Sequence, residues 1–125
     1  MELVAIPDND TDTLYVLNER LEPVEANRDE WLAFLKTDAA TVAVTNFGGR
    51  AKVVTTFTGV DDGFAAEGEP PYVFETMSTF YDGGDDYEGH RTWLEAEERH
   101  RGRVQEIAKL LRMLPHHDEQ VALPL

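Results

Sequence analysis

Hydrophobic residues in the first third of the chain fall in short runs that predict β-strands and one helix. The β-type runs, separated by turn-forming polar residues, are residues 3–6, 14–17 and 21–24. Asn27 is followed three residues later by Glu30, and this pair predicts a helix start because each side chain can cap a main-chain donor of the first turn. Apolar residues from Trp31 onward recur at helical spacing, so we expect a short helix that ends near Asp38.

The middle of the chain alternates with a period of two, which predicts a sheet centred on residues 41–80. β-branched residues dominate two runs on either side of Gly48 and Gly49. Because both glycines can adopt the positive φ of a tight turn, these runs predict a hairpin. A third strand is predicted at residues 72–79. The segments rich in Gly, Pro or Asp at residues 61–71 and 82–86 are predicted as loops.

The last third of the chain carries the clearest helical pattern. Thr92 and Glu95 form a capping box at its start. One apolar stripe then repeats at three and four residues: Trp93, Ala96, His100, Val104, Ile107, Ala108 and Leu111. Pro115 ends the helix, so we expect a single domain at residues 1–115 and a polar tail at 116–125.

These elements predict an α+β fold with one short N-terminal helix. The predicted sheet is antiparallel and rich in hairpins, and the long C-terminal helix covers one of its faces. We expect four side chains of that helix to pack on the sheet: Trp93, Val104, Ile107 and Leu111.

Composition narrows the class of protein. A chain of 125 residues with 42% hydrophobic and 29% charged residues fits one globular domain. The absence of cysteine excludes disulfide frameworks and thiolate metal sites. No apolar stretch is long enough to cross a bilayer and no secretory signal pattern is present, so we expect a cytoplasmic protein without a membrane role. The formal net charge of −14 disfavours direct binding to nucleic acid.

The charges are unevenly distributed along the chain. Residues 61–90 hold nine acids and no Lys or Arg, whereas six of the eleven basic residues lie within residues 91–112. Seven of the acids lie in the predicted loops and are the candidate binding residues: Asp61, Asp62, Glu67, Glu69, Asp82, Asp85 and Asp86. Three interpretations stay open. The acidity serves solubility or reflects a saline or GC-rich host, the carboxylates imitate DNA phosphates, or the surface binds another protein.

Glu75 and His100 are the candidate acid/base pair. On the predicted strand Glu75 shares a face with Val73 and Met77, where its carboxylate is partly removed from water. His100 lies on the stripe of the helix that covers this sheet, so the two side chains can meet. Such a pair is either a buried structural hydrogen bond or the general acid and base of a small enzyme. Ser78 is the only serine and lies in no nucleophile motif.

One acidic segment has the spacing of a cation site. Positions 1, 3, 5 and 12 of a calcium-binding loop are matched by Asp8, Asp10, Asp12 and Glu19. Thr13 stands where that loop needs glycine, so a plain acidic turn is the alternative interpretation. His116 and His117 have no second cluster at metal-ligand spacing. We expect no cofactor.

Four motifs are spread over residues 53–104: TFTGVD at 56–61, GEPP at 68–71, FETM at 74–77 and TWLEAE at 92–97, followed by His100. Together they resemble small uncharacterised proteins encoded by phages and prophages, mainly of actinobacteria. Asp62 and Arg99 stand where the pattern of those proteins has His and Gly. Since these proteins have no established activity, the resemblance implies a genomic origin and no mechanism.

The sequence therefore predicts a phage-type accessory protein that is not an enzyme and acts by contact with a protein partner. One alternative is an acidic DNA mimic that inhibits a host nucleic-acid-binding protein. The other is a small acid/base or cation-dependent enzyme that uses Glu75 and His100.

Overall fold

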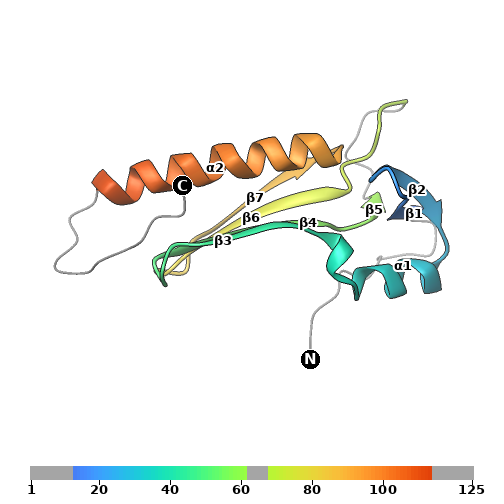
Figure 1. Cartoon of the computed structure of the whole chain (residues 1–125), viewed down its shortest axis with the longest axis horizontal. Helices are drawn as coiled ribbons and strands as arrows, with labels where there is room; N and C mark the ends of the chain where they lie inside the picture. The colour runs from blue at the N-terminus through green and yellow to red at the C-terminus, as the bar shows by residue number, and fades with distance from the viewer. Residues whose placement is uncertain (1–12, 62–67, 114–125) are drawn as a thin grey trace.

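The computed structural model describes residues 13–61 and 68–113. These residues form an α+β fold with two antiparallel sheets (Figure 1). The smaller sheet has the strand order β2-β1-β5 and is built from Thr13–Leu17 (β1), Pro23–Ala26 (β2) and Val60–Asp61 (β5). The larger sheet has the order β3-β4-β6-β7 and is built from Thr41–Asn46 (β3), Ala51–Phe57 (β4), Phe74–Phe80 (β6) and Asp85–His90 (β7).

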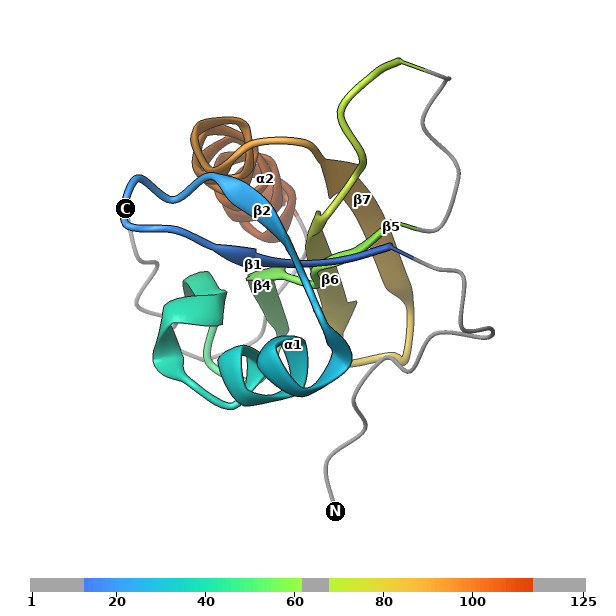
Figure 2. The same ribbon diagram turned by 90° about the vertical axis from the view of Figure 1, so that its right-hand side faces the viewer.

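Two α-helices lie on different sides of this framework. The long helix α2, Trp93–Met113, runs along one face of the larger sheet, as predicted (Figure 1). The short helix α1, Arg28–Leu35, and the 3-10 turn Asp38–Ala40 lie at the other side, near the smaller sheet (Figure 2). Among the described residues, no helix is both long and apolar enough to cross a membrane.

The predicted start of α1 is confirmed. Asn27 Oδ1 accepts a hydrogen bond from the Glu30 main-chain N–H at 2.8 Å, and the Asn27 N–H donates to Glu30 Oε1 at 2.9 Å. One turn later Trp31 is fully buried, and its indole N–H donates to the carbonyl oxygen of Thr58 at 2.9 Å. The capping box and the buried indole together fix α1 against the end of β4.

The predicted hairpin between β3 and β4 is also confirmed. Gly48 and Gly49 have φ values of 61° and 89°, and the Phe47 N–H donates to the carbonyl oxygen of Ala51 at 2.9 Å. A side chain at either glycine would strain the turn, because L-residues rarely adopt a positive φ.

Two parts of the predicted fold are wrong. The strands form two sheets rather than one, because β1 pairs with β2 and β5 and not with the larger sheet. The second error is β7, which begins within the segment 82–86 that was predicted as a loop and pairs with β6. Its sequence is polar and its first five residues are exposed, so it lacks the alternating apolar pattern by which a strand is identified.

The core under α2 is divided into two apolar clusters. One cluster lies toward the C-terminal end of the helix and contains Phe47, Ala51, Val53, Val104, Ile107, Ala108 and Leu111, with Phe80 packed against it. The other lies toward the N-terminal end and contains Leu17, Phe57, Val73, Phe74 and Ala96, with Phe34 and Trp93 among its neighbours. The predicted packing of Trp93, Val104, Ile107 and Leu111 on the sheet is therefore confirmed.

Gly59 forms the corner at which the chain leaves the larger sheet for the smaller one. Its φ is +70°, and a Cβ placed there would lie 2.6 Å from the carbonyl oxygen of Tyr15 and 2.8 Å from the indole of Trp31. The Gly59 carbonyl oxygen accepts a hydrogen bond from the Tyr15 N–H at 2.8 Å. Only glycine fits this corner, because both the dihedral angle and the space exclude a side chain.

Candidate functional site

A layer of polar side chains is buried between the two apolar clusters. Its members come from all four strands of the larger sheet and from α2: Thr45, Thr55, Thr76, His90 and His100. Thr55, Thr76, His90 and His100 are each 5% exposed or less. The layer lies on the sheet face that α2 covers. Thr55 and Thr76 are buried there, whereas the residues next to them in β4 and β6 point to the opposite face.

These side chains form one continuous chain of hydrogen bonds. His100 contacts Thr45 Oγ1 through Nε2 at 2.9 Å and Thr55 Oγ1 through Nδ1 at 2.8 Å. The hydroxyls of Thr55 and Thr76 lie 2.7 Å apart, and Thr76 Oγ1 lies 2.8 Å from His90 Nε2. The three hydroxyls, both ring nitrogens of His100 and Nε2 of His90 therefore have partners, which is the condition for burying polar groups at small cost.

Counting hydrogens shows how many protons the layer can hold. With both rings neutral, the four hydrogen bonds can all run from Thr45 toward His90 or all run in the reverse direction, from His90 toward Thr45, and all four are satisfied either way. One added proton, on either ring, is also accommodated. Two added protons are not, because both rings would then donate inward and one of the hydroxyls of Thr55 and Thr76 would have no acceptor within the layer.

Burial also acts on the protonation of the two rings. Desolvation lowers the pKa of His100 below its ordinary value. Desolvation likewise lowers the pKa of His90, and the nearby carboxylates of Glu88 and Glu95 oppose this effect only in part. The lowered pKa values favour the neutral form of both rings at pH 7.

The structure does not bring Glu75 and His100 together. Glu75 lies on β6 between Phe74 and Thr76, whose side chains are buried on the face that α2 covers. Because neighbouring residues of a strand point to opposite faces, Glu75 lies on the other face of the sheet. His100 instead bonds two threonines. Neither histidine is exposed enough to reach a substrate, since His90 is 1% and His100 is 5% exposed.

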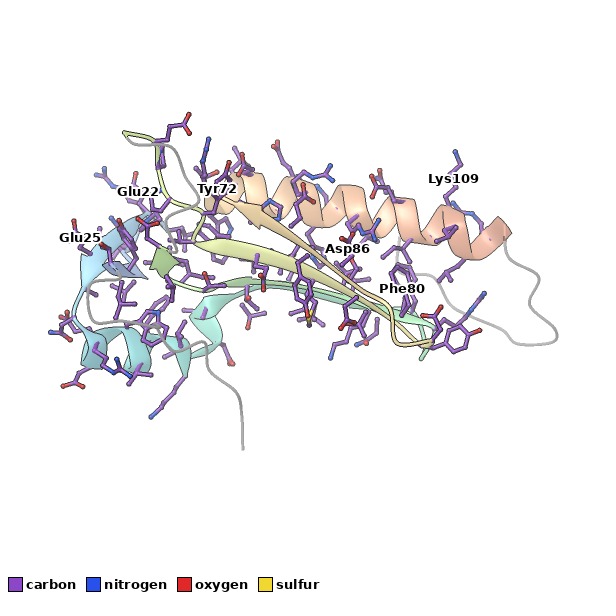
Figure 3. The ribbon with its side chains drawn as sticks, turned by 180° about the vertical axis from the view of Figure 1, so that it is seen from behind. Glu22, Glu25, Tyr72, Phe80, Asp86 and Lys109 are labelled. Atoms are coloured by element: carbon purple, nitrogen blue, oxygen red, sulfur yellow. The ribbon has the colours of Figure 1, made fainter. Side chains whose placement is uncertain are left out.

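Ser78 is also occupied within the fold. Its hydroxyl accepts a hydrogen bond from Arg103 Nε at 2.9 Å. The same guanidinium forms ion pairs with Asp86 at 3.1 Å and Glu106 at 3.2 Å. Figure 3 shows Asp86 on the side of the sheet that faces α2, and Phe80 between the sheet and that helix. Ser78 therefore helps to hold α2 on the sheet and is not poised as a nucleophile.

The candidate binding acids have different environments. Asp61 ends β5, and Asp62 and Glu67 lie outside the described residues. Glu69 pairs with Arg91 at 3.0 Å and Asp86 with Arg103 at 3.1 Å, whereas Asp82 and Asp85 are exposed near the turn between β6 and β7. Glu88 of β7, an acid outside the candidate set, pairs with Arg99 at 3.1 Å. Arginines at the start of α2 and along it thus neutralise part of the acidic segment, which reduces its likeness to a run of DNA phosphates.

Three members of the candidate cation loop, Asp8, Asp10 and Asp12, lie outside the described residues. Its fourth member, Glu19, is exposed in the turn between β1 and β2. Within residues 13–61 and 68–113, no three His, Cys, Asp or Glu side chains are grouped as metal ligands. His116 and His117 also lie outside the described part of the chain.

The sheet face opposite α2 carries an apolar row that sequence reasoning missed. The strand register aligns Val44, Val54, Met77 and Tyr87 side by side across all four strands. The two ends of the row are well exposed, with Val44 at 49% and Tyr87 at 56%. We call this face, defined by that row, the open face, because α2 lies on the other side of the sheet (Figure 1). One residue per strand leaves no sequence signal until the register is known.

Comparison with protein-family models, with curated proteins and with solved structures finds no match. The functional conclusions below therefore depend on the geometry of this chain.

Proposed function

We propose that this protein is a non-enzymatic accessory factor that binds another protein through its open face. The observation that carries the proposal is the apolar row of Val44, Val54, Met77 and Tyr87. An apolar sheet face is normally buried against another element, and here one face has α2 while the other has no described helix along the row. Large exposed apolar patches on small proteins mark interaction sites.

The buried His and Thr layer supports a role without catalysis. Catalytic groups must reach the reacting atoms, whereas both histidines are buried between the sheet and α2. The resemblance to phage and prophage proteins implies a genomic origin and no mechanism, and such an origin is compatible with this proposal.

The charges of the open face define the chemistry of the partner. By strand alternation, Glu75 and Asp85 lie on this face together with one base, Lys52. The whole chain adds a formal charge of −14. The surface therefore fits an amphipathic segment of a partner protein whose apolar side chains cover the row and whose flanks carry Lys or Arg.

The test compares two tyrosines of similar sequence position. Tyr87 belongs to the row, whereas Tyr81 lies outside it in the β6–β7 turn and is 80% exposed. We expect Tyr87→Arg to abolish capture of a partner from a bacterial host extract, because it replaces apolar contact with repulsion of basic flanks. The control Tyr81→Arg should capture the partner as the wild type does.

Footprinting of the captured complex locates the contact. Hydroxyl radicals oxidise exposed Met and Tyr side chains, so binding at the open face should protect Met77 and Tyr87 while Tyr81 stays reactive. The proposal is overturned if the wild type and both variants retain the same proteins, or if the complex leaves Met77 and Tyr87 as reactive as in the free chain.

A further inference from the structure

The edges of the two sheets differ in how well they are protected from pairing. β2 carries Pro23 and Glu25, and β5 has only two residues, one of which is acidic. β7 carries Asp85, Asp86 and Glu88. Charges, proline and short length all discourage the addition of another strand. β3 has the sequence TVAVTN, with neither charge nor proline, and within the described residues it is the only edge strand without these features.

Two main-chain positions of β3 point their hydrogen-bonding groups away from β4. The Phe47 N–H bonds to the Ala51 carbonyl, and two positions along the register Thr45 is paired with Val53. Since bonded and non-bonded pairs alternate in antiparallel strands, the N–H and C=O groups of Val44 and Asn46 point away from β4. The Tyr81 N–H bond to the Arg50 carbonyl fixes the same alternation on the other side of β4.

The bulge in β3 leaves most of this edge regular. The register of β3 on β4 shifts between Thr41 and Ala43, and from Ala43 to Asn46 it is unbroken. Val44 lies in the middle of the regular part and is also the end of the apolar row on the open face. A strand added here would satisfy the outward groups of β3 and cover the exposed flank of Val44.

We propose that β3 pairs with β3 of a second copy of this chain, antiparallel and with Val44 opposite Val44, to form one continuous sheet across a two-fold axis. β3 can pair with a second β3, because the strand is a uniform run of small and β-branched residues. Its side chains therefore alternate between the two faces of the sheet in the same way when the strand is read backward. The apolar row then continues from one copy into the next across the axis, which doubles the open face.

Charge favours a second copy at this edge of the larger sheet over the opposite edge at β7. Two chains of net charge −14 repel each other, most strongly where carboxylates meet. β7 and the turn before it hold Asp82, Asp85, Asp86 and Glu88, whereas β3 has no charge at all. Pairing through β3 therefore keeps these acids on the far edges of the joined sheet.

The first experiment measures mass by sedimentation equilibrium from micromolar to millimolar concentration. A dimer doubles the mass of 14.1 kDa. Val44→Pro removes the central outward N–H without touching a β3–β4 bond, so it should give a folded monomer. The matched control is Glu25→Pro on the edge of the other sheet. Glu25 also points its main-chain groups outward, because the Asn18 N–H bonds the carbonyl of Glu22, which lies three residues before Glu25, and bonded and non-bonded pairs alternate along the strand.

The second experiment leaves the backbone intact and remains informative if Val44→Pro fails to fold. Because the natural chain has no cysteine, Val44→Cys introduces a single thiol. Opposed residues of paired strands lie within disulfide reach, so mild oxidation should link this variant into a dimer. Val24→Cys, at a valine of similar exposure on β2, should remain unlinked.

Several outcomes would overturn the inference: a wild type that stays at 14.1 kDa at every concentration, a dimer that persists in folded Val44→Pro, or equal linking of the two cysteine variants. A monomeric chain whose β3 is protected only when the captured partner is present would assign the edge to that partner instead. These readouts do not depend on the proposed partner binding, so either proposal can fail alone.

Discussion

Burial of His90 and His100 determines how this protein responds to acid. Burial lowers the pKa of both rings in the folded state, whereas in the unfolded chain a histidine has a pKa of about 6.5. Below that value the unfolded chain takes up protons that the folded layer resists. The stabilising contribution of the neutral rings is therefore complete above about pH 6.5 and is lost as pH falls toward the folded-state pKa values.

We predict that the free energy of unfolding falls as pH decreases from 7 to 5, by up to about 1.4 kcal/mol per pH unit for each proton that only the unfolded chain binds. Urea unfolding at a series of pH values measures this slope. His100→Gln removes one titrating ring and keeps two hydrogen-bonding atoms. The slope of its unfolding free energy against pH should therefore be smaller than that of the wild type, by up to the contribution of one proton. Equal slopes in the wild type and the variant would contradict the assignment.

His100 could be placed in the core from its position on the apolar stripe, but its partners could not. A sequence pattern gives the face of a strand on which Thr45, Thr55 or Thr76 lies, and not the register that aligns the three hydroxyls. The expected partner, Glu75, was one position away from the threonine that belongs to the layer. Moving by one residue along a strand changes the face on which the side chain lies. The acid/base hypothesis therefore depended on which face of the strand α2 covers, and periodicity alone does not give that face.

At the scale of elements, α2 is held by apolar contacts at both ends and by polar contacts in between. Leu111 is 4% exposed within the C-terminal apolar cluster, whereas its neighbour Leu110 is 45% exposed on the outer side of the helix. Figure 3 shows Lys109 on the side of the helix that points away from the sheet. This arrangement provides a pair of adjacent leucines that differ only in burial.

We predict that Leu111→Ala lowers the free energy of unfolding by about 2–5 kcal/mol, because it leaves a cavity in the core. Leu110→Ala should change it by less than about 0.5 kcal/mol, because the side chain is largely in water already. Thermal and urea unfolding of both variants give the comparison. If the two variants lose the same stability, α2 does not pack on the sheet as described.

The elements that could be predicted are those with strong local signals. Both predicted helix starts are correct. At α2 the Glu95 N–H donates to Thr92 Oγ1 at 3.0 Å, whereas the Glu95 carboxylate accepts from the N–H of Arg91, one residue before Thr92, at 2.7 Å. β7 could not be predicted, because Asp86 and Glu88, two of its side chains that face α2, are charged and pair with arginines of that helix. Nor could the second sheet, since its pairing of β1 with β5 joins residues that are distant in sequence.

At the scale of the whole molecule, excess negative charge opposes the compact state. The structure pairs Glu69, Asp86, Glu88 and Glu106 with arginines, but exposed pairs of this kind contribute only about 0–1 kcal/mol each. The formal charge of −14 remains. At about 0.01 M ionic strength the Debye length is ~30 Å, so carboxylates over most of the molecule repel one another.

We therefore predict that stability rises as sodium chloride is raised to about 1 M, where the Debye length falls to ~3 Å. Denaturant unfolding in sodium chloride, repeated at equal ionic strength with a salt of a different monovalent cation, separates screening from specific binding. A gain found only with low concentrations of Ca²⁺ would instead support the loop of Asp8, Asp10, Asp12 and Glu19. No gain in any salt would show that the acids are balanced by the arginines.

The corner at Gly59 has a consequence for the order in which the chain folds. Leu14 pairs with Val60, a separation of 60 − 14 = 46 residues, so the smaller sheet closes a long loop. The β3–β4 hairpin closes over three residues between Phe47 and Ala51 and needs no such closure. Because loop closure costs entropy before any contact repays it, local pairs form first and distant pairs follow. We therefore expect the pairing of β1 with β5, and with it the tight approach of Gly59 to Tyr15 and Trp31, to form after the larger sheet.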